Sequence, residues 1–445
     1  MNTAITLENI AAMKQKFTSQ PISRIARNAA TQNGVNSAAR NPETLRSALH
    51  EFSIQLDQGN ITNQKKSGRC WMFAALNCLR FPMIQQLKLD EFELSQSYTL
   101  FYDKLEKSNY FLENILKTLD EPTDSRLVSY LLASPVQDGG QWDMLRNLVK
   151  KYGLVPKSAM PETSVSSNTA DLNFYLTTKL REFACKLRAE YKNGMLESNL
   201  RAQKDAMLQT VYNMLCICLG CPPETFDLEL RSKDNEFICD RNLTPQSFYD
   251  KYVGIDLDDY VSVINAPTEN KPLHRSFTVK FLGNVEEGKA IRYVNLPCES
   301  LKRAAIAQMK DGSPVWFGCD VGKCSVRDEG ILDLTAYEPE LLFGTDFSMT
   351  KSERLDYGQS LLTHAMVFQG VNLDENGKPN RWRVENSWGK DTGHDGYLVM
   401  SDAWFDEYLY QVVVNKKYLT SEELAEYDSQ PIALDPWDPM GSLAR

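Results

Sequence analysis

The stretch 64-QKKSGRCWMFAALNCLRF-81 decides the fold, because it joins a polar loop that contains a glycine to a long apolar segment at Cys70. Apolar residues crowd every face after this point, which predicts a helix over about 70–87 that is buried in the body of the protein. The N–H groups and dipole at a helix N-terminus stabilise an anion, so a thiol placed there loses its proton more easily. Cys70 is therefore the predicted reactive thiol among ten cysteines.

The order of the predicted elements indicates the fold class. Helical periodicity predicts helices over 92–119, 143–153, 165–220 and 300–312, and strand-like runs occur at 314–320, 365–373, 381–388, 396–401 and 411–416. Residues 222–300 are mixed. Helices early and strands late are typical of the α+β class rather than of alternating βαβ units.

The last segment, 430-QPIALDPWDPMGSLAR-445, has three prolines within nine residues. Since proline interrupts helices, we expect this tail to run extended. Trp437 and Met440 favour an ordered tail, because a solvated chain end has little use for large apolar side chains.

Composition narrows the classes of function. The 49 basic and 59 acidic residues give a net charge of −10 without a basic cluster, which argues against nucleic-acid binding. The N-terminus has no signal-peptide pattern, and no run of about 18 apolar residues occurs, so we expect no membrane association and a cytoplasmic protein. Ten cysteines are too sparse for a disulfide framework and fit a reducing compartment.

One of the four histidines lies at the entry to an apolar strand. This residue, His364, can exchange a proton with Cys70 if a partner fixes its ring. Asn386 offers an amide oxygen for that purpose, and Trp388 can shield the hydrogen bond from water. Gln64 can donate to the oxyanion that develops when a carbonyl is attacked, alongside the backbone N–H of Cys70.

A rival motif, 216-CICLGC-221, contains C-x-x-C. It follows an apolar helical run, so it lies at the wrong end of its helix for a redox pair, and no second Cys or His cluster completes a zinc site. Packing is the better interpretation. His50, His274 and His394 have no evident partners in the sequence.

These residues together resemble a known family. Q-x5-C-W from Gln64, a histidine at a strand start, and 385-ENSWG-389 followed by 396-GYL-398 are similar to the papain-like cysteine peptidases. The resemblance extends to 138-DGGQWDMLRNLVKKYGLVPKSAMPE-162 and 304-AAIAQMKDGSPVWFGCDVG-322. The length, the large insert and the tail 436-PWDPMG-441 closely resemble the bleomycin hydrolase and bacterial aminopeptidase C branch, over essentially the whole chain.

This resemblance implies a papain-like fold, with a helical half, a β-barrel half and the active site in the cleft between them. It assigns Cys70 as nucleophile, His364 as general acid and base, Asn386 as the residue that orients the imidazole, and Gln64 as oxyanion donor. The reaction that it implies needs no metal and no cofactor.

The resemblance also implies how the chain is divided. The expected segments are an N-terminal extension (1–60), the helical half (61–165), a mainly helical insertion that serves oligomerisation (166–300), the β-barrel half (301–415) and a C-terminal arm that reaches the cleft (416–445).

Substrate recognition is also implied by the family. Gly139, Gly140 and Trp388 would contact the substrate. An arm that fills one side of the cleft leaves room for only one or two residues before the scissile bond, and its terminal carboxylate would pair with the α-ammonium of the substrate. That carboxylate belongs to Arg445, or to Ala444 after trimming. The expectation is a cysteine aminopeptidase that acts on peptides with a free N-terminus and forms a homohexamer.

Two alternatives remain open from the sequence. One is a cytosolic cysteine endopeptidase or amidase with the same reactive residues and no gating by the chain end. The other is a non-catalytic redox or metal-binding protein built on 216-CICLGC-221.

Overall fold

Helices fill the first half of the chain and strands most of the second, as predicted. The structure is a computed structural model and describes residues 3–56 and 59–444. Its α-helices are α1 Leu7–Thr18, α2 Pro21–Asn33, α3 Val35–Ala39, α4 Pro42–Ser47, α5 Cys70–Gln86, α6 Gln96–Lys117, α7 Arg126–Ala133, α8 Trp142–Tyr152, α9 Ala170–Lys192, α10 Glu197–Leu219, α11 Pro245–Phe248, α12 Cys298–Lys310, α13 Pro339–Phe343, α14 Lys351–Asp356, α15 Asp402–Tyr408 and α16 Ser421–Asp428. Helical turns of other types are the π-helical η1 Tyr249–Val253 and the 3₁₀-helical η2 Leu257–Asp259, η3 Lys416–Tyr418 and η4 Pro439–Ala444.

The described strands form one large sheet and one separate hairpin. The large sheet has the order β14-β5-β6-β4-β13-β7-β10-β11-β12-β9-β8, with β1 also paired to β10, and β2 pairs with β3. Their bounds are β1 Ile54–Gln55, β2 Phe226–Arg231, β3 Phe237–Leu243, β4 Tyr260–Ile264, β5 Arg275–Val279, β6 Tyr293–Asn295, β7 Val315–Cys319, β8 Ser325–Val326, β9 Ile331–Leu332, β10 His364–Leu373, β11 Pro379–Glu385, β12 Tyr397–Ser401, β13 Leu409–Asn415 and β14 Ile432–Leu434.

The longest strand, β10, holds a central place in the sheet. It is antiparallel to β7 on one side and to β11 on the other, and its first residue, His364, pairs with Cys319. Residues 364–371 are buried without interruption, as a strand covered on both faces requires. The start of β10 is therefore a rigid position deep in the molecule.

Helix α5 joins the helical part of the molecule to the sheet. It packs against β10 and β7, and buried side chains surround it, which is the all-round apolar pattern predicted from the sequence. The Nε1–H of Trp316 in β7 donates to the carbonyl of Trp71 in the first turn of α5, at 3.1 Å. This contact fixes the N-terminus of α5 against the sheet.

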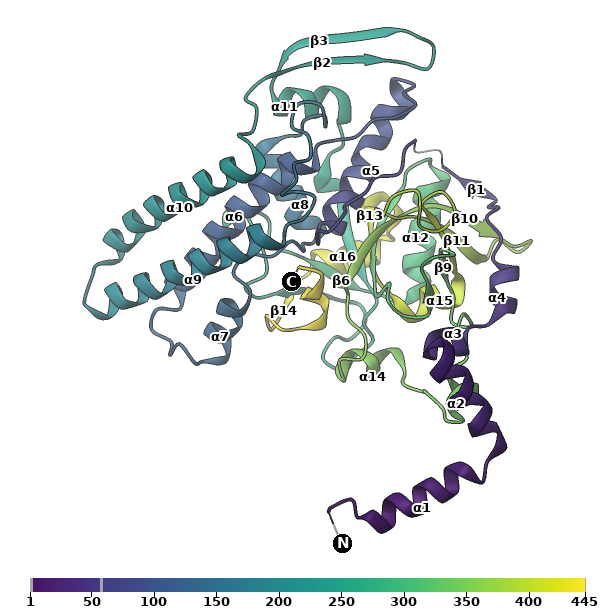
Figure 1. The fold of residues 1–445 in the computed structure, drawn as a ribbon. Helices are drawn as coiled ribbons and strands as arrows, with labels where there is room; N and C mark the ends of the chain where they lie inside the picture. The colour runs from purple at the N-terminus through teal and green to yellow at the C-terminus, as the bar shows by residue number, and fades with distance from the viewer. Residues whose placement is uncertain (1–2, 57–58, 445) are drawn as a thin grey trace.

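Three strands from the middle of the chain also belong to the large sheet. Strand β4 lies between β13 and β6, and β5 pairs with β6 and β14. The hairpin of β2 and β3 instead projects from the end of the helical part (Figure 1). The division of the chain into the five predicted segments stays a prediction.

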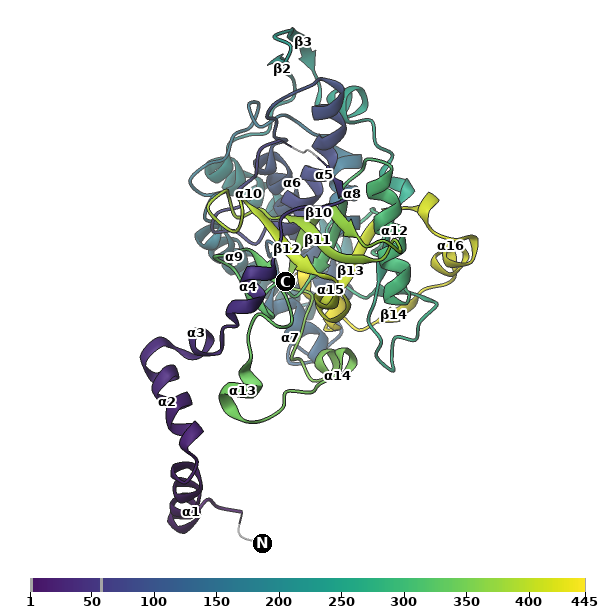
Figure 2. The same cartoon turned by 90° about the vertical axis from the view of Figure 1, so that its right-hand side faces the viewer.

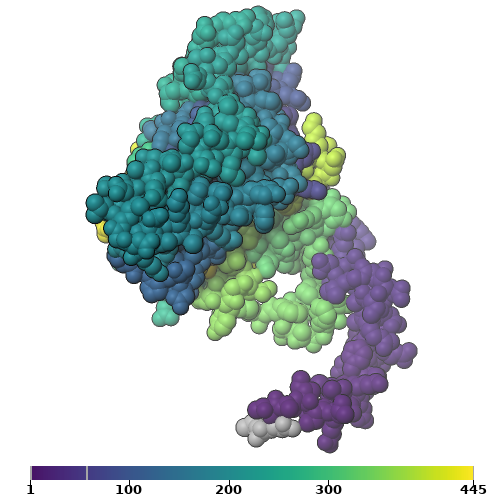
Figure 3. All heavy atoms as spheres, turned by 60° about the vertical axis from the view of Figure 1, so that its left-hand side comes forward, coloured from purple at the N-terminus to yellow at the C-terminus, as the bar shows by residue number. Residues whose placement is uncertain are grey.

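The first residues form an arm that stands away from the rest of the molecule. Helices α1 and α2 extend from the body in two views (Figures 1 and 2), and the space-filling view shows them reaching outward with no other segment against their tip (Figure 3). Neither helix contains a buried residue. Strand β14, near the other end of the chain, belongs by contrast to the large sheet, where it pairs with β5.

Candidate active site

The thiol of Cys70 lies at the first residue of α5, as predicted. The side chain is buried, with 5% of its surface exposed. Burial raises the pKa of the thiol to about 11, although backbone hydrogen bonds from Ala365 and Trp71 act in the opposite direction. The contact with Ala365 places the sulfur beside the start of β10, next to His364.

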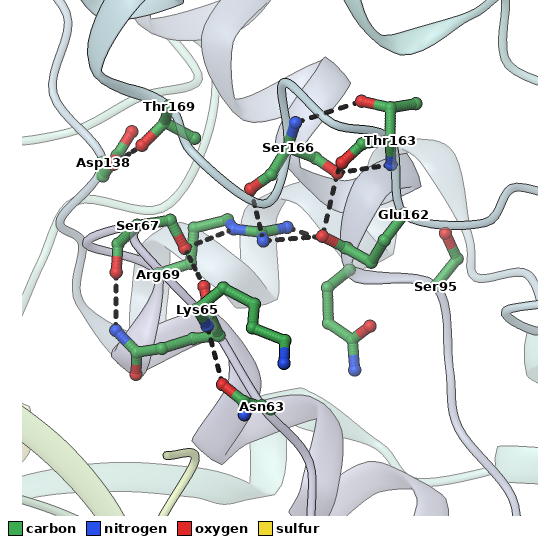
Figure 4. Close-up of polar contacts among 12 residues, drawn as sticks. Asn63, Lys65, Ser67, Arg69, Ser95, Asp138, Glu162, Thr163, Ser166 and Thr169 are labelled. Carbon is green, nitrogen blue, oxygen red and sulfur yellow. Dashed lines mark hydrogen bonds and ion pairs between the residues drawn. The ribbon is translucent and has the colours of Figure 1, made fainter. Parts of the chain in front are cut away.

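Arg69 anchors the turn that precedes the thiol (Figure 4). Its fully buried guanidinium forms a two-point contact with Glu162, at 2.9 and 2.7 Å, and also donates to the carbonyl of Ser166 and the hydroxyl of Ser67. Planar contacts of this kind fix direction as well as distance. The sequence prediction missed this residue; its signal was a charge immediately before a helix that opens with the apolar run 70-CWMFAAL-76.

The amide of Gln64 is held between two segments of the site. Its Oε1 accepts from the Ser387 hydroxyl at 2.7 Å, and its Nε2 donates to the Ser67 carbonyl at 2.6 Å. The backbone N–H of Gln64 donates to the Ser387 carbonyl. Because an amide nitrogen carries two hydrogens, one remains for a ligand beside the N-terminus of α5.

His364 and Asn386 lie together at the ends of neighbouring strands. The imidazole Nε2 is 3.0 Å from Asn386 Oδ1, and that same oxygen accepts from the Ser387 backbone N–H at 2.8 Å. A backbone N–H needs an acceptor, so the atom facing the imidazole is the amide oxygen and Nε2 must carry a proton. The ring nitrogen left to exchange a proton with a thiol is Nδ1.

Trp388 covers this histidine. The two ring centroids are 5.0 Å apart at a tilt of 36°. Burial lowers the pKa of His364 to about 4, the hydrogen bond that its ring donates to Asn386 partly offsets this, and the positive charge of Arg327 lowers it further. Burial thus favours the neutral imidazole and the neutral thiol of Cys70. A charged pair forms only by proton transfer from one to the other, which leaves their net charge unchanged.

The loop with Gly139 and Gly140 packs against the same turn. A Cβ on Gly140 would lie 2.5 Å from the Trp71 ring, so only glycine permits this approach. Lys107 donates to the Gly139 carbonyl at 2.6 Å, which occupies one of the backbone groups expected to face a substrate. The indole N–H of Trp71 donates to the carbonyl of Asp138, which ties the loop to α5.

The Asp138 carboxylate joins this loop to the turn before Cys70. It accepts from the Gly68 backbone N–H at 2.9 Å and pairs with buried Lys104 at 2.8 Å. Burial alone would raise the pKa of Asp138, but Lys104 and the hydrogen bonds from Thr169 and Gly68 hold it well below its usual range. The sequence prediction missed Lys104 and Asp138, although a lysine on the apolar side of the 92–119 helical pattern was a signal.

A second buried group couples α5 to the strands. Glu385, next to Asn386, is 3.3 Å from Arg80 and accepts from Asn77 and Gln369, both at 2.8 Å. Burial raises the pKa of this carboxyl to about 7, although Arg80 lowers it. The sequence prediction also missed Glu385, which it included only as the first residue of the motif 385-ENSWG-389.

The C-terminal tail is ordered and ends close to these residues. The Ser442 hydroxyl donates to the Leu362 carbonyl, two residues before His364, at 2.7 Å, and Gln141 Nε2 donates to the Met440 carbonyl at 3.2 Å. The tail therefore touches both the glycine loop and the segment just before the strand that carries the histidine.

Further contacts fix the approach of the tail. The Arg126 guanidinium lies 3.6 Å from the Trp437 ring centroid, and a buried pair joins Lys271 to Asp438 at 2.9 Å. The expectation of an extended tail was partly wrong: β14 is extended, but residues 439–444 form the 3₁₀-helix η4, because a proline is tolerated at the first position of a helical turn. Of Ala444 only the backbone is described, and Arg445 lies outside the described residues.

The other histidines and the cysteine motif lie elsewhere. His50 and His394 stack with ring centroids 4.4 Å apart, and His274 Nδ1 is 3.1 Å from Glu426, so these histidines have the partners that the sequence did not reveal. The segment 216–221 includes the C-terminal end of α10, as predicted. Within the described ranges, no three His, Cys, Asp or Glu side chains gather as they do around a metal ion, and no helix has the length and apolar character needed to span a membrane.

Comparison with known proteins gives full-length matches. The model of the Peptidase C1-like family matches residues 4–441. Aminopeptidase C of Listeria innocua is 50% identical over 444 residues, covering 100% of both chains, and human bleomycin hydrolase is 42% identical over 452 residues, covering 100% of this chain and 99% of that one. The crystal structure of PepW from Lactobacillus rhamnosis, 52% identical, superposes with a TM-score of 0.97 over 99% of each chain.

Proposed function

The chain belongs to the Peptidase C1-like family and is a papain-like cysteine aminopeptidase, and we propose that Cys70, His364, Asn386 and Gln64 carry its reaction. The observation that carries the assignment is the Asn386-His364 hydrogen bond, made at the point where the Cys70 thiol meets the start of β10. This arrangement leaves Nδ1 of the imidazole free to take the thiol proton.

In the proposed mechanism, His364 Nδ1 accepts the proton of Cys70 as the sulfur attacks the first peptide carbonyl. The second hydrogen of the Gln64 amide and the backbone N–H of Cys70 stabilise the oxyanion. His364 then protonates the leaving amine, which leaves a thioester on Cys70. The neutral imidazole finally activates water, which releases the residue and restores the thiol.

We further infer that the C-terminal tail restricts this reaction to free N-termini. This proposal is supported by the contacts of Ser442 with Leu362 and of Met440 with Gln141, which join residues 440–442 to the segment before β10 and to the glycine loop. A terminal carboxylate there would pair with the substrate α-ammonium in surroundings partly shielded from water. Gly139, Gly140 and Trp388 are proposed to contact the substrate, and the carboxylate is assigned to Arg445, or to Ala444 after trimming.

The test compares an aminoacyl arylamide with its N-acetylated form. We expect the full-length chain to prefer the free amine strongly, and a chain that ends at Met440 to lose that preference while still cleaving. A second variant, which ends at Asp435, lacks the whole tail beyond β14. The variant that ends at Met440 is the shorter deletion and keeps the test valid if the longer deletion misfolds. Equal cleavage of both substrates by the full-length chain would support the endopeptidase alternative.

We propose that the protein forms a homohexamer, and that the N-terminal arm contributes to the contacts between subunits in addition to the insertion (166–300) expected to do so. Apolar side chains along the arm are exposed: Ile5 by 75%, Leu7 by 84%, Ile10 by 51% and Met13 by 62%. An exposed apolar stripe of this kind marks a contact surface. Sedimentation velocity should give a hexamer for the full chain and smaller species for a chain that starts at residue 41; a monomeric full chain would refute the proposal.

We also propose that the protein is cytoplasmic, because a catalytic thiol and nine further cysteines suit a reducing compartment. Fractionation of the cells that make it, with activity followed in each fraction, tests this assignment. Activity found mainly outside the cytoplasmic fraction would contradict it.

A further inference from the structure

An open hollow of about 370 Å³ lies beside the proposed catalytic residues. Among the residues that line it are Asn63, Lys65, Arg327, Asp328, Trp388 and Asp391. Trp388 packs on His364 from one side, and Asn63 and Lys65 flank Gln64 in the chain. The hollow therefore adjoins both the imidazole and the oxyanion position.

The direction of the substrate decides what enters this hollow, and this step rests on the proposed function. The tail lies near the glycine loop and Leu362, so the substrate N-terminus points toward that side. The amine that leaves must be within reach of the His364 imidazole, which protonates it. The rest of the leaving peptide then continues past His364, along Trp388 and into the hollow.

The charges in the hollow favour an anion. The Arg327 guanidinium lies 4.9 Å from the Trp388 ring centroid, and neither Arg327 nor Lys65 forms an ion pair within the described residues. Of the two carboxylates, Asp328 is already paired with Arg40 at 3.4 Å, which leaves Asp391. In Figure 4 the Lys65 side chain ends without a contact to the residues drawn.

The distances fit a short leaving peptide. Ring separations of 5.0 and 4.9 Å place the Arg327 guanidinium no more than about 10 Å from the His364 ring. Hydrogen bonds of about 3 Å at each end leave a gap of at most about 4 Å, which one extended residue of about 3.5 Å spans. A carboxylate on the first residue after the scissile bond can therefore meet Arg327.

We propose that this hollow is a subsite for a carboxylate on the leaving part of the substrate, with Arg327 as the residue that determines specificity. The carboxylate has two sources, the C-terminus of a dipeptide and an acidic side chain directly after the scissile bond. The enzyme thus favours dipeptides with a free C-terminus, or peptides with Asp or Glu in the second position.

The experiment measures kcat/KM for pairs of substrates that differ only in this charge. Alanyl-alanine is compared with its C-terminal amide, and alanyl-glutamic acid amide with alanyl-glutamine amide, which separates the two sources. Full-length wild type is set against Arg327→Gln, Arg327→Lys and, as a matched control, Lys378→Gln, an exposed lysine in the β10–β11 turn. An aminoacyl arylamide, whose leaving group is neutral, reports the basal reaction of every variant.

We expect wild type and Lys378→Gln to prefer at least one anionic substrate about three- to tenfold, as an ion pair near solvent allows. The ratio of kcat/KM for the anionic substrate to that for its neutral partner should fall to about one in Arg327→Gln. Arg327→Lys should keep part of the wild-type ratio. Because each ratio is taken within one enzyme, a change in the packing of Trp388 alone does not alter it. An unchanged ratio in Arg327→Gln, or no preference in wild type, overturns the inference while arylamide cleavage persists. If wild type did not cleave the arylamide at all, the proposed function itself would be refuted.

Discussion

Glu385 links the stability of this protein to pH. Its side chain is 1% exposed, and burial raises its pKa from 4.5 to about 7 although Arg80 is close. A carboxyl with a higher pKa in the folded state than in the unfolded state holds an extra proton in the folded state between those two values. The contribution is therefore fully present below about pH 4.5 and is lost as the pH rises through about 7.

Replacing Glu385 with Gln removes this titration and keeps the size of the neutral form. The difference between a pKa of 4.5 and one of about 7 corresponds to about 3 kcal/mol. The free energy of unfolding of Glu385→Gln should therefore rise relative to wild type by about 3 kcal/mol between acidic and mildly alkaline pH. The sign follows because only wild type must lose a proton from a buried carboxyl as the pH increases.

Urea unfolding followed by tryptophan fluorescence, at intervals from about pH 5 to about pH 8, measures this difference. Glu375→Gln, an exposed glutamate in the turn between β10 and β11, is the matched control and should show no trend. If Glu385→Gln instead becomes less stable than wild type as the pH rises, the three donors from Arg80, Asn77 and Gln369 outweigh burial. The carboxylate would then be ionised throughout, and the reasoning would be wrong.

Three further predictions concern the site itself. Gln64→Ala should lower kcat about 100-fold or more, because one oxyanion donor is lost; a change confined to KM in steady-state kinetics would contradict this. Trp388→Ala admits water to His364, so its pKa should rise from about 4 and move the acid limb of the kcat/KM profile to higher pH; an unmoved limb would show that other groups bury the ring. Gly140→Ala brings a Cβ to 2.5 Å from an indole ring and should lower the free energy of unfolding by about 1–3 kcal/mol in urea, whereas Gly322→Ala, with space around it, should not.

The local features of this site could be predicted from the sequence. A thiol at the junction of a glycine-containing loop and a largely apolar helix predicts Cys70 at the start of α5, and a histidine before an apolar run predicts His364 at the start of β10. These assignments depend on periodicity and on residues close in the chain, which single-sequence reasoning captures.

The contacts that hold the site could not be predicted in this way. Arg69 meets Glu162 across 93 positions and Asn77 meets Glu385 across 308, and periodicity says nothing about which distant charges come together. The end of the tail was misjudged for a different reason. Proline removes a hydrogen-bond donor, which is harmless in a first helical turn, so Pro439 begins η4 rather than preventing it.

The C-terminal tail can finally be seen as a ligand that is joined covalently to its own receptor. Strand β14 and the pair of Lys271 with Asp438 hold it beside the site, so its effective concentration there is about millimolar or higher. If the tail gates the cleft as proposed, a free peptide that reaches toward the same side competes with it, whereas a compound with a single amino-terminal residue does not. Extended peptide inhibitors of related endopeptidases should therefore bind weakly here, and exchanging only the last few residues of the chain should change selectivity without altering Cys70.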